Sequence, residues 1–269
     1  MRWYSVVYNG MRWYAPFRNT AIICLCVALG GGAAFALGGL ALHRKYRKNA
    51  KCHRRMTLYH SFPFRSSRCA WLIAELGIED KFQVEKVTLH GENMTDMENY
   101  KKSVHPHGTI PALKLDNDVI VLESGAICMY LADLFGGLAP HYLERAEYYN
   151  WICYATATID PVLEPLYMQL THMPEDQRDT ALVEKMTNKF KEIAAYLSSV
   201  LEKRQYICGD RFTAADCVLG YNMWWASVIQ SGAILQDYPV LVDYVERIKQ
   251  RDGFKKAFIR KPKPSGGSL

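Results

Sequence analysis

The first 55 residues contain no acidic side chain, although they carry ten of the 33 Lys and Arg residues. The rest of the chain has 23 such bases against 27 acids, so the net charge of +6 belongs to this basic leader. The remainder is mildly acidic. This charge distribution gives no reason to expect a nucleic-acid partner.

The sequence also lacks any C-x-x-C pair and any neighbouring H-x-x-H group, which argues against a structural zinc site and a dithiol redox motif. No metal is therefore expected. We expect the thiols to be reduced and mostly buried, as in a reducing compartment. There are eight cysteines, at positions Cys24, Cys26, Cys52, Cys69, Cys128, Cys153, Cys208 and Cys217.

The leader, residues 1–55, contains an uncharged stretch at about residues 20–42 that is long enough to cross a bilayer as one helix. Basic residues are denser after this stretch than before it, which places the following domain on the cytosolic side. The sequence thus predicts a membrane-anchored protein. The alternatives are a mitochondrial or other organellar transit peptide, or a cytosolic protein in which translation starts at Met56.

Residues 56–136 have the pattern of a small α/β domain. A short strand at 57–60 precedes the loop Ser61–Arg68, and an apolar run with helical period then ends near Gly77. A second strand is expected at 82–87, which completes a βαβ unit.

A second part of this domain begins at His105-Pro106-His107-Gly108, where proline and glycine exclude a regular helix. Ile110-Pro111 follows, and two short strands then flank the turn residues 116–118. Glu123-Ser124 opens the next helix.

Residues 143–261 show helical period throughout, so an all-helical domain is expected there, followed by a flexible tail at 262–269. Within it, Thr213 and Asp216 have the spacing of a capping box at the start of a helix. We interpret this pair as a folding element without a catalytic role.

The segment Ile110-Pro111-Ala112-Leu113 and the later Glu123-Ser124-Gly125-Ala126-Ile127 resemble the glutathione-binding motifs of the soluble glutathione transferases. The resemblance covers about 200 of the 269 residues. It implies a thioredoxin-like N-terminal domain followed by a helical-bundle C-terminal domain. It also implies a cis-proline at Pro111, whose preceding residue, Ile110, offers its backbone to the cysteinyl part of glutathione.

The helix that begins at Ser124 explains how the γ-glutamyl end of glutathione can be held. A helix N-terminus supplies free N–H groups and positive potential for a carboxylate. Ser124 adds a hydroxyl donor, and Glu123 can face the ammonium group of the ligand. Candidates for the glycyl carboxylate are His107 and Lys102, with Lys101 and His105 as further choices.

The group that activates the glutathione thiol is less well defined. Serine-type members carry the pattern S-R-S-x-R after the first strand, and this chain has Phe64 in place of the first serine. Ser66 is the favoured catalytic hydroxyl. Ser67, Tyr59 and Ser61 are the alternatives, because each lies close to the start of the same helix.

The resemblance implies a transferase that conjugates glutathione to hydrophobic electrophiles, as in detoxification, with glutathione as co-substrate. Peroxidase and isomerase activities would use the same site. Tyr149 and Cys153, in the aromatic-rich first helix of the second domain, are the candidates for the electrophile pocket. The resemblance also implies a homodimer. The alternative function is a membrane-tethered module that binds glutathione or carries ligands without catalysis.

Overall fold

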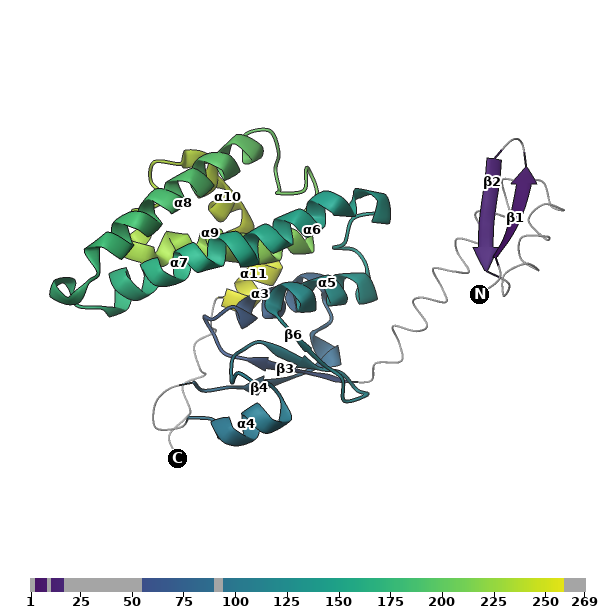
Figure 1. Ribbon diagram of the computed structural model, residues 1–269, viewed down its shortest axis with the longest axis horizontal. Helices are drawn as coiled ribbons and strands as arrows, with labels where there is room; N and C mark the ends of the chain where they lie inside the picture. The colour runs from purple at the N-terminus through teal and green to yellow at the C-terminus, as the bar shows by residue number, and fades with distance from the viewer. Residues whose placement is uncertain (1–2, 9–10, 17–54, 90–93, 259–269) are drawn as a thin grey trace, which may run out of the picture. The chain divides into compact units, whose positions relative to one another are not determined.

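The computed structural model describes residues 3–8, 11–16, 55–89 and 94–258 (Figure 1). The chain divides into two compact units, residues 1–52 and residues 53–269. In the first unit, strand β1 (Trp3–Tyr8) pairs antiparallel with β2 (Met11–Pro16), and Tyr8 lies opposite Met11.

The prediction of a membrane-anchored protein is wrong for the part of the chain that the structure describes. None of the helices within these ranges is long and apolar enough to cross a bilayer. The predicted span at residues 20–42 and the tail at 262–269 both lie outside the described residues.

The second unit begins with a four-stranded sheet in the order β4-β3-β5-β6. Strands β3 and β4 are parallel, so a crossover must join them, and α3 supplies it. Strands β5 and β6 run antiparallel to their neighbours, as in a hairpin. The bounds are β3 (Met56–His60), α3 (Ser66–Leu76), β4 (Phe82–Lys86), β5 (Ala112–Lys114) and β6 (Ile120–Leu122).

Helices cover both faces of this sheet. Helix α4 (Met97–Ser103) lies on one face, while α3 and α5 (Ser124–Phe135) lie between the sheet and the helical domain (Figure 1). Helix α3 ends at Gly77, whose φ of 63° is the left-handed conformation that glycine adopts without strain. The short 3₁₀ helix η2 (Glu79–Lys81) leads into β4.

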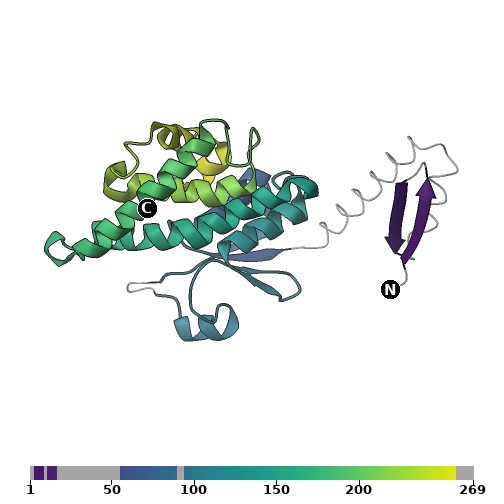
Figure 2. The ribbon, with the colours of Figure 1, turned by 45° about the horizontal axis from the view of Figure 1, so that its top comes forward.

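The remaining elements are all helical. Helices α7 and α8 run side by side as a long antiparallel pair (Figure 2). The elements are η3 (Tyr142–Glu144), α6 (Arg145–Tyr154), the π-helix η4 (Ala155–Ile159), α7 (Asp160–Tyr167), the π-helix η5 (Met168–His172), η6 (Glu175–Gln177), α8 (Thr180–Leu201), α9 (Ala214–Val228), η7 (Ile229–Gly232), α10 (Pro239–Lys249) and α11 (Asp252–Phe258).

The two domains share one hydrophobic core. Trp71 of α3 is fully buried, and its ring packs 5.6 Å from that of Phe212 and 5.1 Å from that of Phe254, measured between centroids. Helix α11 thus returns the C-terminal end of the helical domain onto α3. A thioredoxin-like domain followed by a helical domain is confirmed as the fold.

Thr213 and Asp216 form the capping box at the start of α9. The Thr213 N–H and hydroxyl both donate to Asp216 Oδ2, at 2.9 and 3.1 Å. The second carboxylate oxygen accepts from the backbone N–H of Ile207 and from the hydroxyl of Tyr244. Asp216 therefore ties three segments of the helical domain together.

Candidate active site

Three cavities follow one another along the loop between β3 and α3. The polar cavity has a volume of about 360 Å³, and its wall includes Ile110, Pro111, Glu123 and Ser124. The aromatic cavity, of about 680 Å³, includes Tyr167, Met168, Trp224 and Trp225. The lysine cavity, of about 490 Å³, includes Lys86 and Lys256.

Adjacent cavities share part of their walls. Arg65, Thr109, Ile110 and Glu164 border both the polar and the aromatic cavity. Phe64 and Leu89 border both the aromatic and the lysine cavity. A ligand in the polar cavity can therefore meet a second ligand in the aromatic cavity at Arg65 and Ile110.

The N-terminus of α5 lies on the wall of the polar cavity. Ser124 is the first residue of this helix and is buried, while Glu123 just before it is exposed. Glu123 has a φ of 69°, a strained conformation for a non-glycine residue that costs about 1–3 kcal/mol. Such strain is typical of binding sites, and here it holds the start of α5 and a carboxylate side by side.

The segment before β5 forms the opposite wall. The Ile110–Pro111 bond is cis, the isomer that the resemblance implies. Tyr100 donates from its hydroxyl to the carbonyl of Thr109 at 3.0 Å, and His105 Nε2 lies 2.9 Å from the Thr109 hydroxyl. His105 is buried, and burial, followed by the proximity of His107, lowers its pKa. These contacts fix the backbone of Thr109 and Ile110.

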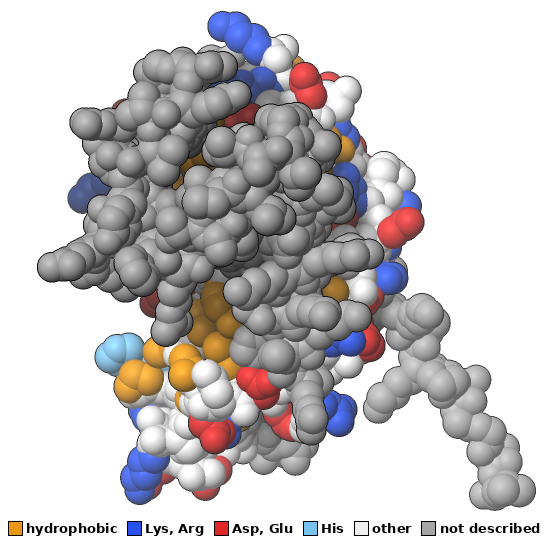
Figure 3. Space-filling model, turned by 90° about the vertical axis from the view of Figure 1, so that its right-hand side faces the viewer, with side chains coloured by type: hydrophobic (Ala, Val, Ile, Leu, Met, Phe, Trp, Pro, Cys, Tyr) orange, Lys and Arg blue, Asp and Glu red, His pale blue; other side chains and the backbone are white. Residues whose placement is uncertain are grey.

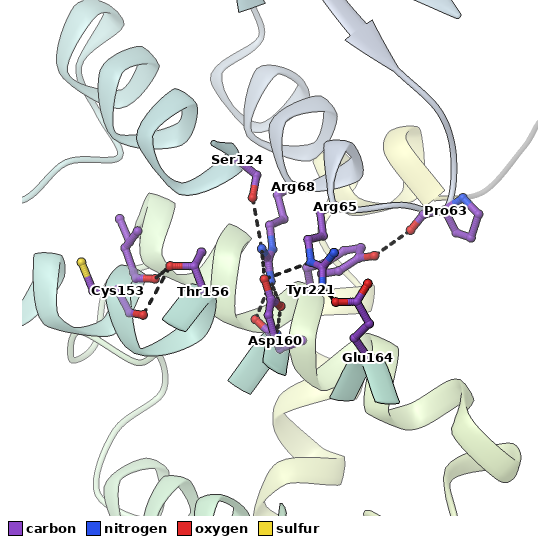
Figure 4. A network of polar contacts seen from close by, with 11 residues as sticks. Pro63, Arg65, Arg68, Ser124, Cys153, Thr156, Asp160, Glu164 and Tyr221 are labelled. Atoms are coloured by element: carbon purple, nitrogen blue, oxygen red, sulfur yellow. Dashed lines mark hydrogen bonds and ion pairs between the residues drawn. The ribbon is translucent and has the colours of Figure 1, made fainter. Parts of the chain in front are cut away.

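A buried ionic network lies behind the polar cavity (Figure 4). The guanidinium of Arg68 is fully buried and donates to both carboxylate oxygens of Asp160, at 2.7 and 2.9 Å. It also donates to Asn222 Oδ1 at 2.8 Å and lies 4.8 Å from the ring centroid of Tyr221. The Asn222 amide in turn donates to Asp160 at 2.7 Å.

The same guanidinium reaches the polar cavity through Ser124. Arg68 Nη1 donates to Ser124 Oγ at 3.1 Å. This bond uses a lone pair of the hydroxyl, so the Ser124 O–H remains available to donate to an acceptor in the cavity. A carboxylate is the acceptor that the nearby α5 N-terminus favours.

Arg65 is the cation that lies on the cavity wall itself. Its Nε donates to Asp160 Oδ2 at 3.1 Å, and its Nη2 donates to Glu164 Oε2 at 2.9 Å (Figure 4). The guanidinium also lies 5.5 Å from the ring centroid of Trp225. Arg65 therefore connects the start of α3 to α7 and α9.

The aromatic cavity is formed by residues of α7, η5 and α9. The rings of Tyr167 and Trp225 are 5.6 Å apart in an edge-to-face arrangement. Tyr221 donates from its hydroxyl to the carbonyl of Pro63 at 2.8 Å, which holds the loop that carries Phe64 against this wall. The cavity suits a flat, apolar ligand.

The favoured catalytic hydroxyl, Ser66, and its alternatives Ser67 and Tyr59 line none of these three cavities. Ser66 is fully buried; its hydroxyl donates to the carbonyl of Ser61 at 2.9 Å and accepts from the Ser61 N–H at 3.1 Å. His60 Nδ1 lies 2.8 Å from the same oxygen. Ser67 is also fully buried, and Tyr59 packs edge-to-face on Tyr100. Ser61 lines the lysine cavity.

The other predicted site residues divide into two groups. Ile110, Pro111, Glu123, Ser124 and His105 all border the polar cavity. The structure does not bring the remaining candidates to any of the three cavities; these are His107, Lys101, Lys102, Tyr149 and Cys153.

Tyr149 and Cys153 of α6 are replaced as pocket residues by side chains further along the chain. Both are exposed on α6, where Tyr149 packs on Tyr148. The aromatic cavity is built from residues of α7, η5 and α9, and the helical run that begins at α6 contains π turns at 155–159 and 168–172. Side chains after a π turn point in a different direction from those of a continuous α-helix, because the π turn contains more residues.

Sequence analysis missed Arg68, Asp160 and Asn222. Arg68 is the arginine of the S-x-R pattern, and an arginine within an apolar helix run is an unusual residue that indicates a buried partner. Nothing in the sequence pairs it with Asp160, which lies 92 positions away. Among the described residues, no group of three or more His, Cys, Asp or Glu side chains could hold a metal ion.

Comparison with known proteins identifies the two domains. The family model of the glutathione S-transferase N-terminal domain matches residues 65–134, and that of the C-terminal domain matches residues 180–247. Glutathione S-transferase GstA of Escherichia coli O157:H7 is 27% identical over 174 residues, which are 63% of this chain and 82% of that protein. GstB of Escherichia coli K12 is 26% identical, over 58% of this chain and 76% of that protein.

A solved structure has the same fold. It is that of a glutathione transferase family member from Pseudomonas fluorescens Pf-5 with two glutathione molecules bound. The TM-score is 0.68 at 22% sequence identity, and the match covers 76% of this chain and 92% of that one.

Proposed function

Because the chain belongs to the glutathione S-transferase family, with glutathione as its co-substrate, we propose that it conjugates the glutathione thiolate to hydrophobic electrophiles. The observation that carries this proposal is the shared wall of the two cavities. A polar cavity and an aromatic cavity meet at Arg65, Thr109, Ile110 and Glu164. Two ligands of opposite polarity can react across that border.

The polar cavity is the proposed site of glutathione. The γ-glutamyl carboxylate would accept from the Ser124 hydroxyl and from the first N–H groups of α5. Glu123 would face the ammonium group beside it. The cysteinyl backbone would pair with Ile110, and this directs the sulfur toward the border with the aromatic cavity. His107 and Lys102 remain predictions for the glycyl end.

The aromatic cavity is the proposed site of the electrophile. Its walls of Tyr167, Trp224 and Trp225 favour planar apolar molecules, which gain from burial and from ring stacking. The thiolate would attack the electrophilic carbon, a C–S bond would form, and the leaving group would depart with the bonding electron pair. Peroxide reduction or isomerisation at the same sulfur would need the same geometry.

Calorimetric titration of the full chain with glutathione, followed by turnover assays with 1-chloro-2,4-dinitrobenzene and a panel of other electrophiles, tests the proposal. We expect binding and turnover in the parent. In Ser124→Ala, affinity should fall roughly tenfold to a hundredfold, because a hydrogen bond to a charged group is worth about 1.5–3 kcal/mol. The control is Ser199→Ala, an exposed serine of α8.

The two steps of this experiment separate the candidate functions. Absence of glutathione binding would reject the proposed site. Binding without turnover of any electrophile would favour a protein that holds glutathione without catalysis. Equal affinities for Ser124→Ala and the parent would place the γ-glutamyl group elsewhere.

We also propose that the chain forms a homodimer. Figure 3 shows hydrophobic side chains gathered on one face of the second unit. Tyr142 and Leu143 of η3, between α5 and α6, are 70% and 75% exposed. Exposed apolar residues of this size favour a partner surface. Light scattering should give twice the chain mass for the parent. The double variant Tyr142→Ser, Leu143→Ser should shift the protein toward the monomer. An unchanged mass in this variant would place the interface elsewhere.

A further inference from the structure

Arg65 lies where the proposed reaction would take place. A role for Arg65 in stabilising the thiolate rests on the proposed function. Four residues border both cavities, namely Arg65, Thr109, Ile110 and Glu164. Arg65 is the cation in this set, so a sulfur anion at the border would find its positive partner there.

The hydroxyl groups near the start of α3 do not reach the border between the polar and aromatic cavities. Ser67 is fully buried, and its hydroxyl has no hydrogen-bond partner among the described residues, but it lines none of the three cavities. Ser61 lines only the lysine cavity. Phe64 has replaced the first serine of the serine-type pattern and offers no donor. The Ser66 hydroxyl is fully buried and is already held by the backbone of Ser61 through two hydrogen bonds. Releasing Ser66 toward the cavity would break both bonds. A thiolate at the border therefore needs another donor.

The guanidinium of Arg65 has such a donor. Nε and Nη2 are used by Asp160 and Glu164, at 3.1 and 2.9 Å. Within the residues that the structure describes, Nη1 has no hydrogen-bond acceptor from the protein. The side chain of Arg65 is 32% exposed and lines both the polar and the aromatic cavity.

The formal charges around Arg65 balance, because the guanidinium groups of Arg65 and Arg68 face the carboxylates of Asp160 and Glu164. Asp160 already accepts two hydrogen bonds from Arg68, so its charge is shared between two guanidinium groups. Glu164 is the remaining counter-charge, and its side chain is 56% exposed, where solvent screens it. His172 on the aromatic side and His105 on the polar side are the other titratable groups on these walls, beside Tyr167, Tyr221 and Glu123.

We propose that Arg65 stabilises the glutathione thiolate, with Nη1–H donating to the sulfur. In this step the S–H bond breaks, the proton passes to solvent and the electron pair stays on sulfur. The N-terminal end of α3, where Arg65 is the capping residue, adds positive potential at the same place. Arginine keeps its charge at all working pH values, so the titration of the thiol is not coupled to a change in the charge of Arg65.

The experiment measures the thiolate absorbance of bound glutathione against pH in the full chain. The parent should show a thiol pKa below the roughly 8.5 of a free thiol. In Arg65→Gln the pKa should rise by about one unit or more, since an opposite charge within hydrogen-bonding distance shifts a pKa by about 1–3 units. Arg65→Lys should keep part of the shift. Arg211→Gln, an exposed arginine on none of the three cavity walls, is the matched control.

A second variant changes the pKa in the opposite direction. Glu164→Gln removes the carboxylate that holds Nη2 and leaves Arg65 with less counter-charge, so the thiol pKa should fall below that of the parent. Affinity for S-methylglutathione, which has no ionisable sulfur, should stay within about threefold of the parent in Arg65→Gln, which shows that the site is folded.

Each outcome has a defined meaning. Failure of the parent to bind glutathione would overturn both the proposed function and the role of Arg65. Binding with an unshifted thiol pKa in the parent would overturn thiolate stabilisation. A lowered pKa in the parent that persists in Arg65→Gln would overturn the role of Arg65 alone. Ser66 would then again be the favoured group for activating the thiol. Loss of S-methylglutathione binding in Arg65→Gln would make Arg65 a structural residue.

Discussion

Arg68 of α3 and Asp160 of α7 form an ion pair with two hydrogen bonds, 2.7 and 2.9 Å long, which joins the two domains behind the polar cavity. The Arg68 side chain is fully buried and that of Asp160 is 9% exposed. Because both groups have lost most of their water, the pair is stabilising only while it is complete. The pair aligns the start of α3 with the helix that carries Glu164.

Breaking this pair should strongly destabilise the protein. Asp160→Ala leaves the Arg68 guanidinium buried without its counter-charge, and such a change costs about 3–5 kcal/mol. Urea unfolding followed by circular dichroism measures the loss. Lys81→Ala, which removes the exposed ion pair with Asp80, is the control and should change stability far less.

The double variant Arg68→Met, Asp160→Leu removes both charges of the ion pair at once. Well-packed apolar replacements of a buried ion pair are often neutral or stabilising, so the double variant should recover much of the stability that Asp160→Ala loses. If Asp160→Ala unfolds at the same urea concentration as the parent, the ion pair makes no net contribution to folding.

Phe64 should determine the size of electrophile that the protein accepts. Its ring lies between the aromatic and the lysine cavities and is 41% exposed. Phe64→Ala would join cavities of about 680 and 490 Å³, so kcat/KM should rise for bulky electrophiles and fall severalfold for small ones. The control is Val119→Ala, an exposed residue of the β5–β6 turn. If kcat/KM changed equally for electrophiles of all sizes, Phe64 would not be the residue that separates the two cavities.

The sequence predicts two backbone features of the polar cavity wall, because both are local. The bond before Pro111 is cis, and Glu123-Ser124 begins a helix at the cavity wall. Both features are encoded within a few residues. Prolines and helix starts are the positions where the sequence constrains the backbone most directly.

The walls of the aromatic cavity could not be predicted in the same way. Which residues line the cavity depends on how α6, α7 and α9 are rotated about their own axes. The aromatic residues of α6 do not by themselves determine that rotation. The π turn at 155–159 changes the rotation just before Asp160, so counting residues from Tyr149 leads to the wrong face. The partner of Arg68 was hidden because Asp160 lies 92 positions away in the sequence.

His105 should make the stability of the protein depend on pH. Burial, with a further contribution from His107, lowers its pKa below the ordinary value of 6.5. Between that lowered value and about 6.5, the unfolded chain binds the proton more readily than the folded chain. Stability therefore rises with pH through this window and is lost as the pH falls through it.

His105→Gln removes the titrating group and retains an acceptor for the His107 N–H, which now donates to His105 Nδ1 at 3.2 Å. Urea midpoints at pH 5 and pH 7.5 should differ less in this variant than in the parent. His141→Gln, at an exposed position, is the control. The same pH dependence in His105→Gln and the parent would show that other groups dominate it.

Asp216→Ala should lower the melting temperature without touching the site. The carboxylate is fully buried and accepts from the N–H of Ile207 and Thr213 and from the hydroxyl of Tyr244. The alanine variant leaves these donors buried without an acceptor, and each such group costs about 1–3 kcal/mol. For a chain of this size, each kcal/mol corresponds to about 2–4 °C.

Scanning calorimetry should therefore show a drop of about 6 °C or more for Asp216→Ala, a figure that assumes about 3 kcal/mol lost in total. Asp216→Asn keeps the side-chain volume and one acceptor oxygen, so its melting temperature should fall between those of the parent and the alanine variant. Glutathione affinity below the transition should match the parent in both, because Asp216 lines none of the three cavities. A melting temperature equal to that of the parent in Asp216→Ala would mean that the capping box does not contribute to folding.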